Sequence, residues 1–155
     1  MDITKINKKI RNEGFERLTE KEKIFKIKYI WQKRNEKNQW GGKFKNIENF
    51  INWYLEQEPR VCACCGIEEE FVRKYFYESN NINNKMTRNN RRGHMLELDK
   101  IDNKLLNTDE KYTEDNCQLL CYPCNNAKSN LCNDNITFEP IAKGIKEFSF
   151  HSKMY

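Results

Sequence analysis

Two Cys-x-x-Cys pairs constrain the fold of this chain more than any other feature of its sequence. Cys62 and Cys65 form the first pair, and Cys121 and Cys124 form the second. Each pair can present two thiolates from a tight turn to one centre, as a tetrahedral zinc ion requires. Gly66 follows the first pair and suits a turn where the backbone folds back on itself. The pattern predicts a structural zinc held by these four cysteines.

Disulfide bonds are a weaker explanation of the cysteines. The chain has seven cysteines, an odd number, and its polar start does not resemble an export signal. Cys64 could replace Cys62 or Cys65 as a ligand, but both pairs share the i, i+3 spacing, and Cys117 and Cys132 are expected to be packed thiols. The alternative to zinc is that reduced core cysteines fall at this spacing by coincidence. A site closed by four thiolates has no open position, so any catalytic metal must lie elsewhere.

Composition favours a single soluble domain, and its uneven charge is compatible with a polyanion partner without deciding for one. The chain has 155 residues, 37% hydrophobic and 33% charged, and its apolar runs are far too short to span a membrane. We expect a cytoplasmic protein. Residues 1–45 hold 14 Lys and Arg against 6 Asp and Glu, a net charge of +8, whereas residues 46–155 carry a net charge of −3. A basic arm suits a nucleic-acid partner, although a solvated lysine-rich helix would give the same pattern.

Helical patterns dominate both ends of the chain. Thr19 and Glu22 form a capping-box signature, which predicts a helix that ends before Trp40. A second helix is expected over 47–57, where apolar residues recur with one-face spacing after the N-cap candidate Asn46. Further helices are expected over 3–12, over 67–77 and over 140–148. In the last of these, Pro140 would lie in the first turn and Ile141, Ile145 and Phe148 would face inward.

The centre of the chain predicts the order strand, loop, strand, helix. Alternation indicates a first strand over 94–101 and a second over 116–120, and Pro123 suits the start of the helix that follows. Residues 79–92 form a polar, asparagine-rich basic tract, for which a DNA-contacting loop and an idle insertion are the alternatives.

These central motifs together resemble the HNH endonucleases of the His-Me-finger, or ββα-metal, group. The matching elements are Cys-x-x-Cys-Gly, then Leu-Glu-Leu-Asp followed by a basic residue, then Asn-x-Gln-Leu-Leu-Cys-x-x-Cys-Asn-x-x-Lys. A looser likeness extends to the PacI-type restriction endonucleases. The resemblance implies an α+β fold, with a ββα-metal core held together by the four-cysteine zinc site and with N-terminal and C-terminal helices. The expected regions are a basic helical part at 1–58, the nuclease core at 59–132 and a C-terminal helix and tail at 133–155.

The resemblance also assigns a catalytic centre. Asp99 matches the metal-binding aspartate, Asn125 matches the second metal ligand, and Asn116 matches the asparagine that braces the loop between the strands. Two hard oxygen ligands suit Mg²⁺ or Mn²⁺. The implied function is metal-dependent, site-specific hydrolysis of double-stranded DNA by a homodimer, as in type II restriction. The alternatives are a phage or mobile-element nicking or homing nuclease, a DNA-binding module whose catalytic centre has decayed, and an RNA-directed or purely structural zinc protein.

Lys100 departs from the family pattern, which usually has histidine at this position as the general base. A lysine with its ordinary pKa is protonated and cannot accept the proton of water, so we expect Lys100 to stabilise transition-state charge instead. The candidates for the base are His94, Tyr75, Tyr77, Glu97 and bulk hydroxide.

The remaining assignments concern contacts around this centre. Besides being a candidate base, Glu97 could be a further metal ligand, or it could form a salt bridge with Lys128 in the scaffold. The residues expected to contact DNA are Arg88, Arg91, Arg92 and Lys128.

Overall fold

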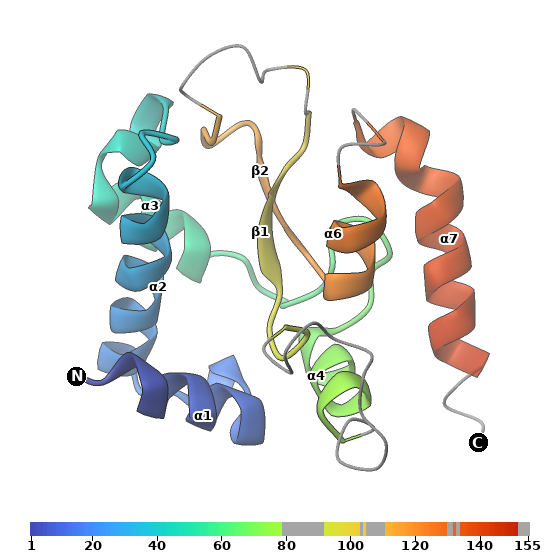
Figure 1. Ribbon diagram of the computed structural model, residues 1–155, viewed down its shortest axis with the longest axis horizontal. Coiled ribbons are helices and arrows are strands. Elements are labelled where there is room, and N and C mark those ends of the chain that lie inside the picture. Colours follow the sequence, from blue (N-terminus) through green and yellow to red (C-terminus); the bar gives the residue numbers. More distant parts are fainter. Residues whose placement is uncertain (79–91, 103, 105–110, 130–131, 133, 152–155) are drawn as a thin grey trace.

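A short antiparallel hairpin lies between two groups of helices (Figure 1). Strand β1 (Glu97–Lys100) pairs with β2 (Cys117–Leu120), with Asp99 opposite Gln118. This computed structural model describes residues 1–78, 92–102, 104, 111–129, 132 and 134–151. The N-terminal helices cover one side of the hairpin, and the helices that follow β2 cover the other. The predicted α+β order of strand, strand and helix is confirmed.

The N-terminal helices begin where local capping signals predict. They are α1 (Ile3–Glu13), α2 (Glu20–Asn35) and α3 (Ile47–Leu55), with short 3₁₀ turns η1 (Phe15–Arg17) and η2 (Gly42–Lys45) between them. The Thr19 hydroxyl accepts from the Glu22 amide at 3.4 Å, and the Glu22 carboxylate accepts from the Thr19 amide at 2.8 Å. Asn46 caps α3 in the same way, through the Glu48 amide. Because these bonds satisfy orphan backbone donors locally, the sequence predicts them well.

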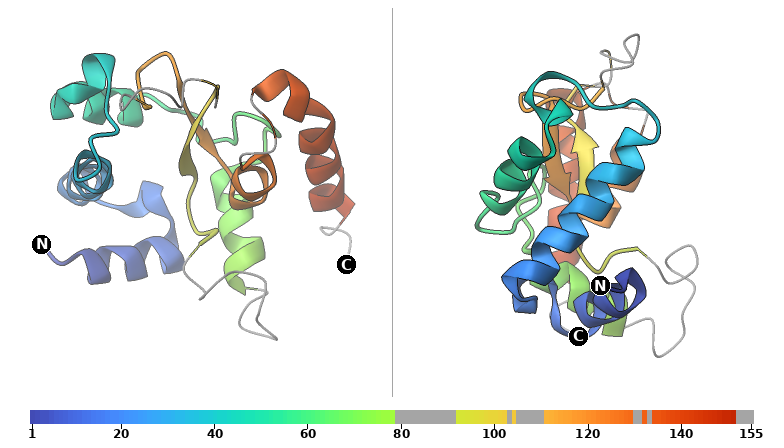
Figure 2. Two further views of the ribbon diagram at one scale, coloured as in Figure 1. Left: turned by 45° about the horizontal axis from the view of Figure 1, so that its top comes forward. Right: turned by 90° about the vertical axis from the view of Figure 1, so that its left-hand side faces the viewer.

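An aromatic cluster joins α2 to α3. Trp40, Phe44 and Phe50 are each at least 96% buried, and the rings of Trp40 and Phe50 lie 4.6 Å apart. The indole N–H of Trp31 donates to the Phe44 carbonyl, and that of Trp40 donates to the Trp31 carbonyl, both at 2.8 Å. Each buried indole therefore has a polar partner, which a buried Trp needs. The right-hand view of Figure 2 shows α2 crossing in front of the hairpin.

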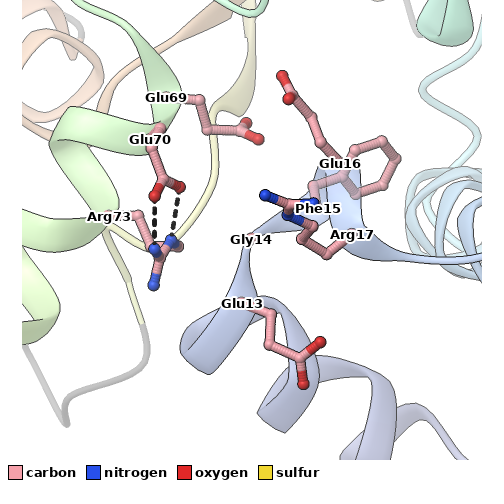
Figure 3. Close-up of a pocket in the computed structure, with 8 residues that line it drawn as sticks. All are labelled: Glu13, Gly14, Phe15, Glu16, Arg17, Glu69, Glu70 and Arg73. Carbon is pink, nitrogen blue, oxygen red and sulfur yellow. Dashed lines mark hydrogen bonds and ion pairs between the residues drawn. The ribbon is translucent and has the colours of Figure 1, made fainter.

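Helix α4 (Glu69–Glu78) lies beside the C-terminal end of α1 (Figure 1). The Arg73 guanidinium donates to the carbonyls of Arg11 and Asn12, both at 3.0 Å, and pairs with Glu70 at 2.7 Å. A cavity of about 310 Å³ lies beside this contact, between the α1–η1 corner and α4 (Figure 3). Because Arg73 satisfies carbonyls that the end of a helix leaves free, this contact is a scaffold feature.

A buried ion pair connects the N-terminal helices to the start of β1. Arg60 and Glu69 form two hydrogen bonds, at 3.0 and 2.8 Å, and both side chains are almost fully buried. The same carboxylate accepts the amide of Leu96 at 2.6 Å. The Arg60 guanidinium also lies 4.5 Å from the Phe15 ring and 5.2 Å from the Tyr54 ring. Glu69 therefore sets where β1 begins.

We expect Glu69→Gln to lower the free energy of unfolding by about 3–5 kcal/mol, because removal of one partner leaves the Arg60 charge buried and unpaired. Glutamine keeps an oxygen that can accept from the Leu96 amide, so the loss of stability reports the removal of the Glu69 charge. Glu68→Gln is the matched control, since Glu68 is exposed, and it should change stability by less than about 0.5 kcal/mol. Urea unfolding followed by circular dichroism measures both. Equal stability of the two variants would contradict this role.

Strand β1 is shorter than the strand predicted over 94–101. Residues 92–95 form bends, and Gly93 has a φ of 88°, in the left-handed region that favours glycine. His94 therefore lies before the strand and not in it, as the predicted range had placed it. Alternation of side chains holds only where the backbone stays extended.

The C-terminal helix also differs from its prediction. Helix α7 spans Asn135–His151, so Pro140 lies inside the helix and not in its first turn. Asp134 caps the helix by accepting the Thr137 amide at 2.8 Å. Pro140 cannot donate to the Ile136 carbonyl, and Ile136 is 82% exposed, so water can serve that carbonyl.

The buried face of α7 is rotated from the predicted one. Phe138 and Ala142 are buried and Ile145 is partly buried, whereas Ile141 is 45% and Phe148 is 64% exposed. The inward orientation predicted for Ile141 and Phe148 is therefore wrong. The helical spacing was recognised correctly, but the helix begins at Asn135, before the predicted range, and its buried face includes Phe138, which that range left out.

Helix α6 (Tyr122–Lys128) follows β2 directly, with Pro123 in its first turn as predicted. Most of the basic tract at 79–92, including Arg88 and Arg91, lies outside the described residues. Within the described part of the chain, no helix combines the length and apolar character that crossing a membrane requires.

Candidate active site

Four cysteine sulfur atoms form the tightest cluster of potential metal ligands in the described part of the chain. The Sγ atoms of Cys62, Cys65, Cys121 and Cys124 lie within 4.8 Å of one another, and all four residues are buried. The sulfur atoms of Cys65 and Cys121 are 3.7 Å apart. Four thiolates at about 2.3 Å from a zinc ion have sulfur–sulfur distances of about 3.8 Å, so the cluster fits a tetrahedral zinc.

The other thiols near the cluster do not belong to it. Burial raises the pKa of Cys64 to about 12 and also raises the pKa of Cys117, so both favour the neutral thiol. The Cys64 thiol lies 3.5 Å from the Asn135 side-chain oxygen and not in the cluster. The i, i+3 spacing therefore separates the clustered cysteines from their neighbours correctly.

The face of the hairpin that meets α6 carries the acidic residues of β1. Glu97 and Asp99 are two residues apart, so their side chains leave β1 on the same side. Asn125 and Lys128 are three residues apart, so they share one face of α6. Two contacts join the faces, one from Asn125 to Glu97 and the other from Lys128 to Asp99.

Asp99 lies at the centre of a buried network. One of its oxygen atoms, Oδ2, accepts from the Lys128 ammonium at 2.8 Å and from the Gln118 amide at 3.0 Å. Lys128 also donates to the carbonyls of Lys100 and Ile101. Gln118 exchanges two further hydrogen bonds with Asn135, at 3.0 and 2.7 Å. The network joins β1, β2, α6 and the start of α7.

The sequence suggested two roles for Lys128, a contact with DNA or an ion pair with Glu97, and its position in the structure fits neither. Its side chain is fully buried, so it has no exposed atom to offer a DNA phosphate. Its carboxylate partner is Asp99, not Glu97. A buried ammonium needs its charge and its three N–H groups satisfied, and Asp99 with two carbonyls does so.

Glu97 forms the second half of the face. It accepts from the Asn125 side-chain amide at 2.6 Å and from the Arg92 guanidinium through both carboxylate oxygens. Arg92 also lies over the Tyr122 ring, at 4.6 Å from its centroid. Its side chain is 39% exposed, so Arg92 can still be reached from solvent. The sequence singled out all three polar residues but did not indicate that they would meet.

Asn116 holds the loop that leaves β1. Its side-chain oxygen accepts from the Asp102 amide at 2.8 Å, and its amide donates to the carbonyls of Asp102 and Lys111, at 3.2 and 3.3 Å. Its own carbonyl accepts from Ile101. Asn116 is 5% exposed. Its hydrogen bonds to Ile101 and Asp102 fix the backbone directly after Asp99 and Lys100.

Lys100 projects from the opposite face of β1 to Asp99, opposite Cys117 in the register. Burial lowers the pKa of Lys100, and Lys111, Lys128 and Arg34 act in the same direction, whereas Asp99 opposes them. Its ammonium therefore belongs to a basic environment on the side of the hairpin that faces α2.

The candidates for the general base are dispersed. His94 lines a cavity with Glu97 and Asn125, and burial lowers its pKa to about 4, with a further effect of Lys26 and Arg11. It is therefore neutral at pH 7 but only a weak base. Tyr75 stacks on Phe71 in α4, with ring centroids 6.2 Å apart. Tyr77 is also in α4, but its side chain is outside the described part.

The oxygen atoms left on this face suit a hard divalent cation. No described residue donates a hydrogen bond to Oδ1 of Asp99 or to Oδ1 of Asn125, whereas both carboxylate oxygens of Glu97 accept hydrogen bonds. Carboxylate and amide oxygens are the ligands that Mg²⁺ and Mn²⁺ prefer. Sequence reasoning missed Gln118, which donates a hydrogen bond to Asp99, and Asn135, which holds the Gln118 side chain. The alternation of the second strand could have indicated Gln118, whereas Asn135 becomes a neighbour only through folding.

Comparison with known proteins gives one informative match. No family model and no curated protein matches the chain significantly. A solved structure, that of the rare-cutting HNH restriction endonuclease PacI, matches with a TM-score of 0.60 at 21% sequence identity. The alignment covers 84% of this chain and 81% of the PacI chain. An alignment of this extent takes in more of the chain than the hairpin and the helix that follows it. The chain has the fold of the HNH restriction endonuclease PacI.

Proposed function

We propose that this protein is a metal-dependent DNA endonuclease of the HNH type that hydrolyses phosphodiester bonds at specific sites. The observation that carries the proposal is the meeting of Asp99 and Glu97 on β1 with the face of α6 that bears Asn125. This arrangement occurs in a fold that is shared with a restriction endonuclease. Acidic and amide side chains on a hairpin and on the helix packed against it suit a metal-assisted hydrolase.

In this proposal the two metal sites have separate roles. Zinc in the four-cysteine cluster ties the segment after Pro59 to the junction of β2 and α6, and so supports the face that carries Asn125. Asp99 and Asn125 hold Mg²⁺ or Mn²⁺, with Glu97 as a further oxygen donor. Bound there, the divalent ion would stabilise the charge that develops on the scissile phosphate and the leaving oxygen.

The remaining residues position these groups. The ion pair with Lys128 orients the Asp99 carboxylate, and Asn116 fixes the backbone after the strand. Lys100, on the other face of β1, supplies a cation on the side of the hairpin that faces α2. His94 is neutral at pH 7 and can orient a water molecule by accepting or donating a hydrogen bond. Hydroxide from bulk solvent is the alternative nucleophile, and it needs no general base.

We expect Asn125→Ala to reduce DNA cleavage on the order of 10³-fold, because loss of a metal ligand removes several kcal/mol of transition-state stabilisation. The protein should stay folded, since Asn125 is only partly buried and loses one hydrogen bond. Asn126→Ala is the matched control, because Asn126 is the next residue of α6 and is exposed. Plasmid nicking and linearisation in Mg²⁺ or Mn²⁺ measure both variants. Equal activity of the two would contradict the ligand assignment.

A decayed, DNA-binding relative is the second candidate, because Lys100 stands where the family usually has histidine. It predicts salt-dependent binding of DNA without cleavage in any divalent metal. If the wild-type protein cleaves DNA and Lys100→Ala does not, the decayed, DNA-binding candidate is excluded. Digestion of a large sequenced DNA, with mapping of the cut ends, then identifies the recognised site. A symmetric site would support the homodimer that the resemblance implies.

A further inference from the structure

A cavity of about 330 Å³ lies between α2 and β1, on the side of the hairpin where α2 runs (Figure 1). We call it the α2–β1 cavity. Lys26, Ile30 and Arg34 line it from α2, at the i, i+4 and i+8 positions of one helix face. His94 and the start of β1 also line the cavity, as does Asn125 of α6. The cavity is therefore continuous with the proposed catalytic face.

Lys26 is a buried cation without a carboxylate. The residue is 8% exposed, and its ammonium donates to the Asn7 side-chain oxygen at 2.7 Å. No described acidic residue forms an ion pair with it. A buried ammonium normally pairs with an acid, because burial without a counter-charge is costly. Burial and the nearby Arg11 lower the pKa of Lys26 to about 8, so the charge persists at neutral pH at a cost to the fold.

Arg34 is the second cation of this face without a carboxylate partner among the described residues. Its guanidinium lies 4.5 Å from the centroid of the Tyr112 ring and 3.5 Å from the Gln39 side-chain oxygen. Arg92, which also lines the cavity, differs because Glu97 neutralises it. The cavity thus holds two cations on α2 whose charge the described protein does not balance, which suits an anionic ligand.

The spacing of these cations favours a chain of phosphates over a single small anion. Lys26 and Arg34 are eight residues apart on one helix, which corresponds to about 12 Å along its axis. We propose that the α2–β1 cavity binds the sugar–phosphate backbone of DNA, with Lys26 and Arg34 as phosphate contacts. This inference rests on the proposed function, since it names the surface that brings a DNA strand to Asn125 and Glu97.

The test compares Lys26→Met and Arg34→Met with Lys21→Met, an exposed lysine on the same helix. Binding of a fluorescein-labelled DNA duplex is measured by anisotropy over a range of NaCl concentrations, without divalent cations, so that no cleavage occurs. Each lost phosphate contact should reduce the slope of log K against log salt by about 0.9, which corresponds to about fivefold weaker binding at about 0.15 M salt. Lys21→Met should bind as the wild type does.

Stability separates this role from a structural one. Methionine keeps the length and packing of Lys26, so the thermal midpoint of Lys26→Met should equal or exceed that of the wild type. If Lys26→Met does not fold, Arg34→Met alone decides the matter, because Arg34 is only partly buried. An unchanged salt slope in the folded variants overturns the inference, as does a wild-type protein that binds an RNA duplex but not the DNA duplex. Weaker DNA binding by the variants, in a protein that never cleaves, supports this inference and removes the nuclease proposal alone.

Discussion

Cys124→Ala should abolish zinc binding and cooperative folding together. A structural zinc held by four thiolates contributes about 10–16 kcal/mol, which matches or exceeds the whole stability of a typical domain, about 5–15 kcal/mol. In this chain the cluster joins the segment after Pro59 to the end of β2 and the start of α6. Without the metal these segments lose their common anchor. The zinc content of the purified protein and its thermal unfolding measure both effects.

Cys117→Ala is the matched control for this variant. Cys117 is 5% exposed and lies on β2, but its sulfur is not part of the four-cysteine cluster. It should retain one zinc per chain and lose only about 1–2 kcal/mol from reduced packing. If Cys124→Ala kept its zinc and melted as the wild type does, the assignment of the cluster as a metal site would be wrong.

Asp99→Ala should lose DNA cleavage and stability at once, for two separable reasons. The loss of cleavage follows from removal of a metal ligand and should be on the order of 10³-fold. The loss of stability, about 3–5 kcal/mol, arises because Lys128 is left fully buried without its carboxylate. Activity and urea unfolding measure the two effects on the same preparations.

The double variant Asp99→Ala with Lys128→Met separates these effects. It removes both buried charges, so it should recover much of the lost stability, because a buried pair can often be replaced by apolar residues. Cleavage should stay lost, since the ligand is still missing. A double variant that is stable and cuts DNA at the wild-type rate would show that Asp99 serves the fold alone.

The parts of the fold that the sequence predicts well are those decided by local interactions. Thr19 with Glu22 and Asn46 with Glu48 satisfy helix N–H groups within three residues, so their signals are complete in the sequence. The four clustered cysteines are also recognisable, because each pair needs only a fixed spacing. The start of β1 depends instead on the contact of Glu69 with the Leu96 amide, 27 residues apart, and the strand prediction was too long there.

The candidate site is predictable in its members but not in its pairings. The resemblance identifies Asp99, Asn116 and Asn125 by their places in a motif. Which partner each one meets depends on how α6 packs against β1, and so Lys128 was assigned to DNA although it is buried against Asp99. Lys26 gave no signal of its own, because one lysine among many on a basic helix is recognised as unusual only when its burial is known.

Cleavage of a supercoiled plasmid by the zinc-loaded protein tests the central claim most directly. The reaction should be started with Mg²⁺ or Mn²⁺ and compared with the same protein without added divalent ion. A chelator is unsuitable as the control, because it would also remove the structural zinc. We expect nicked or linear DNA only when the divalent ion is present and only when Asn125 is intact. A folded protein that binds the plasmid and leaves it uncut in both metals would contradict the proposal.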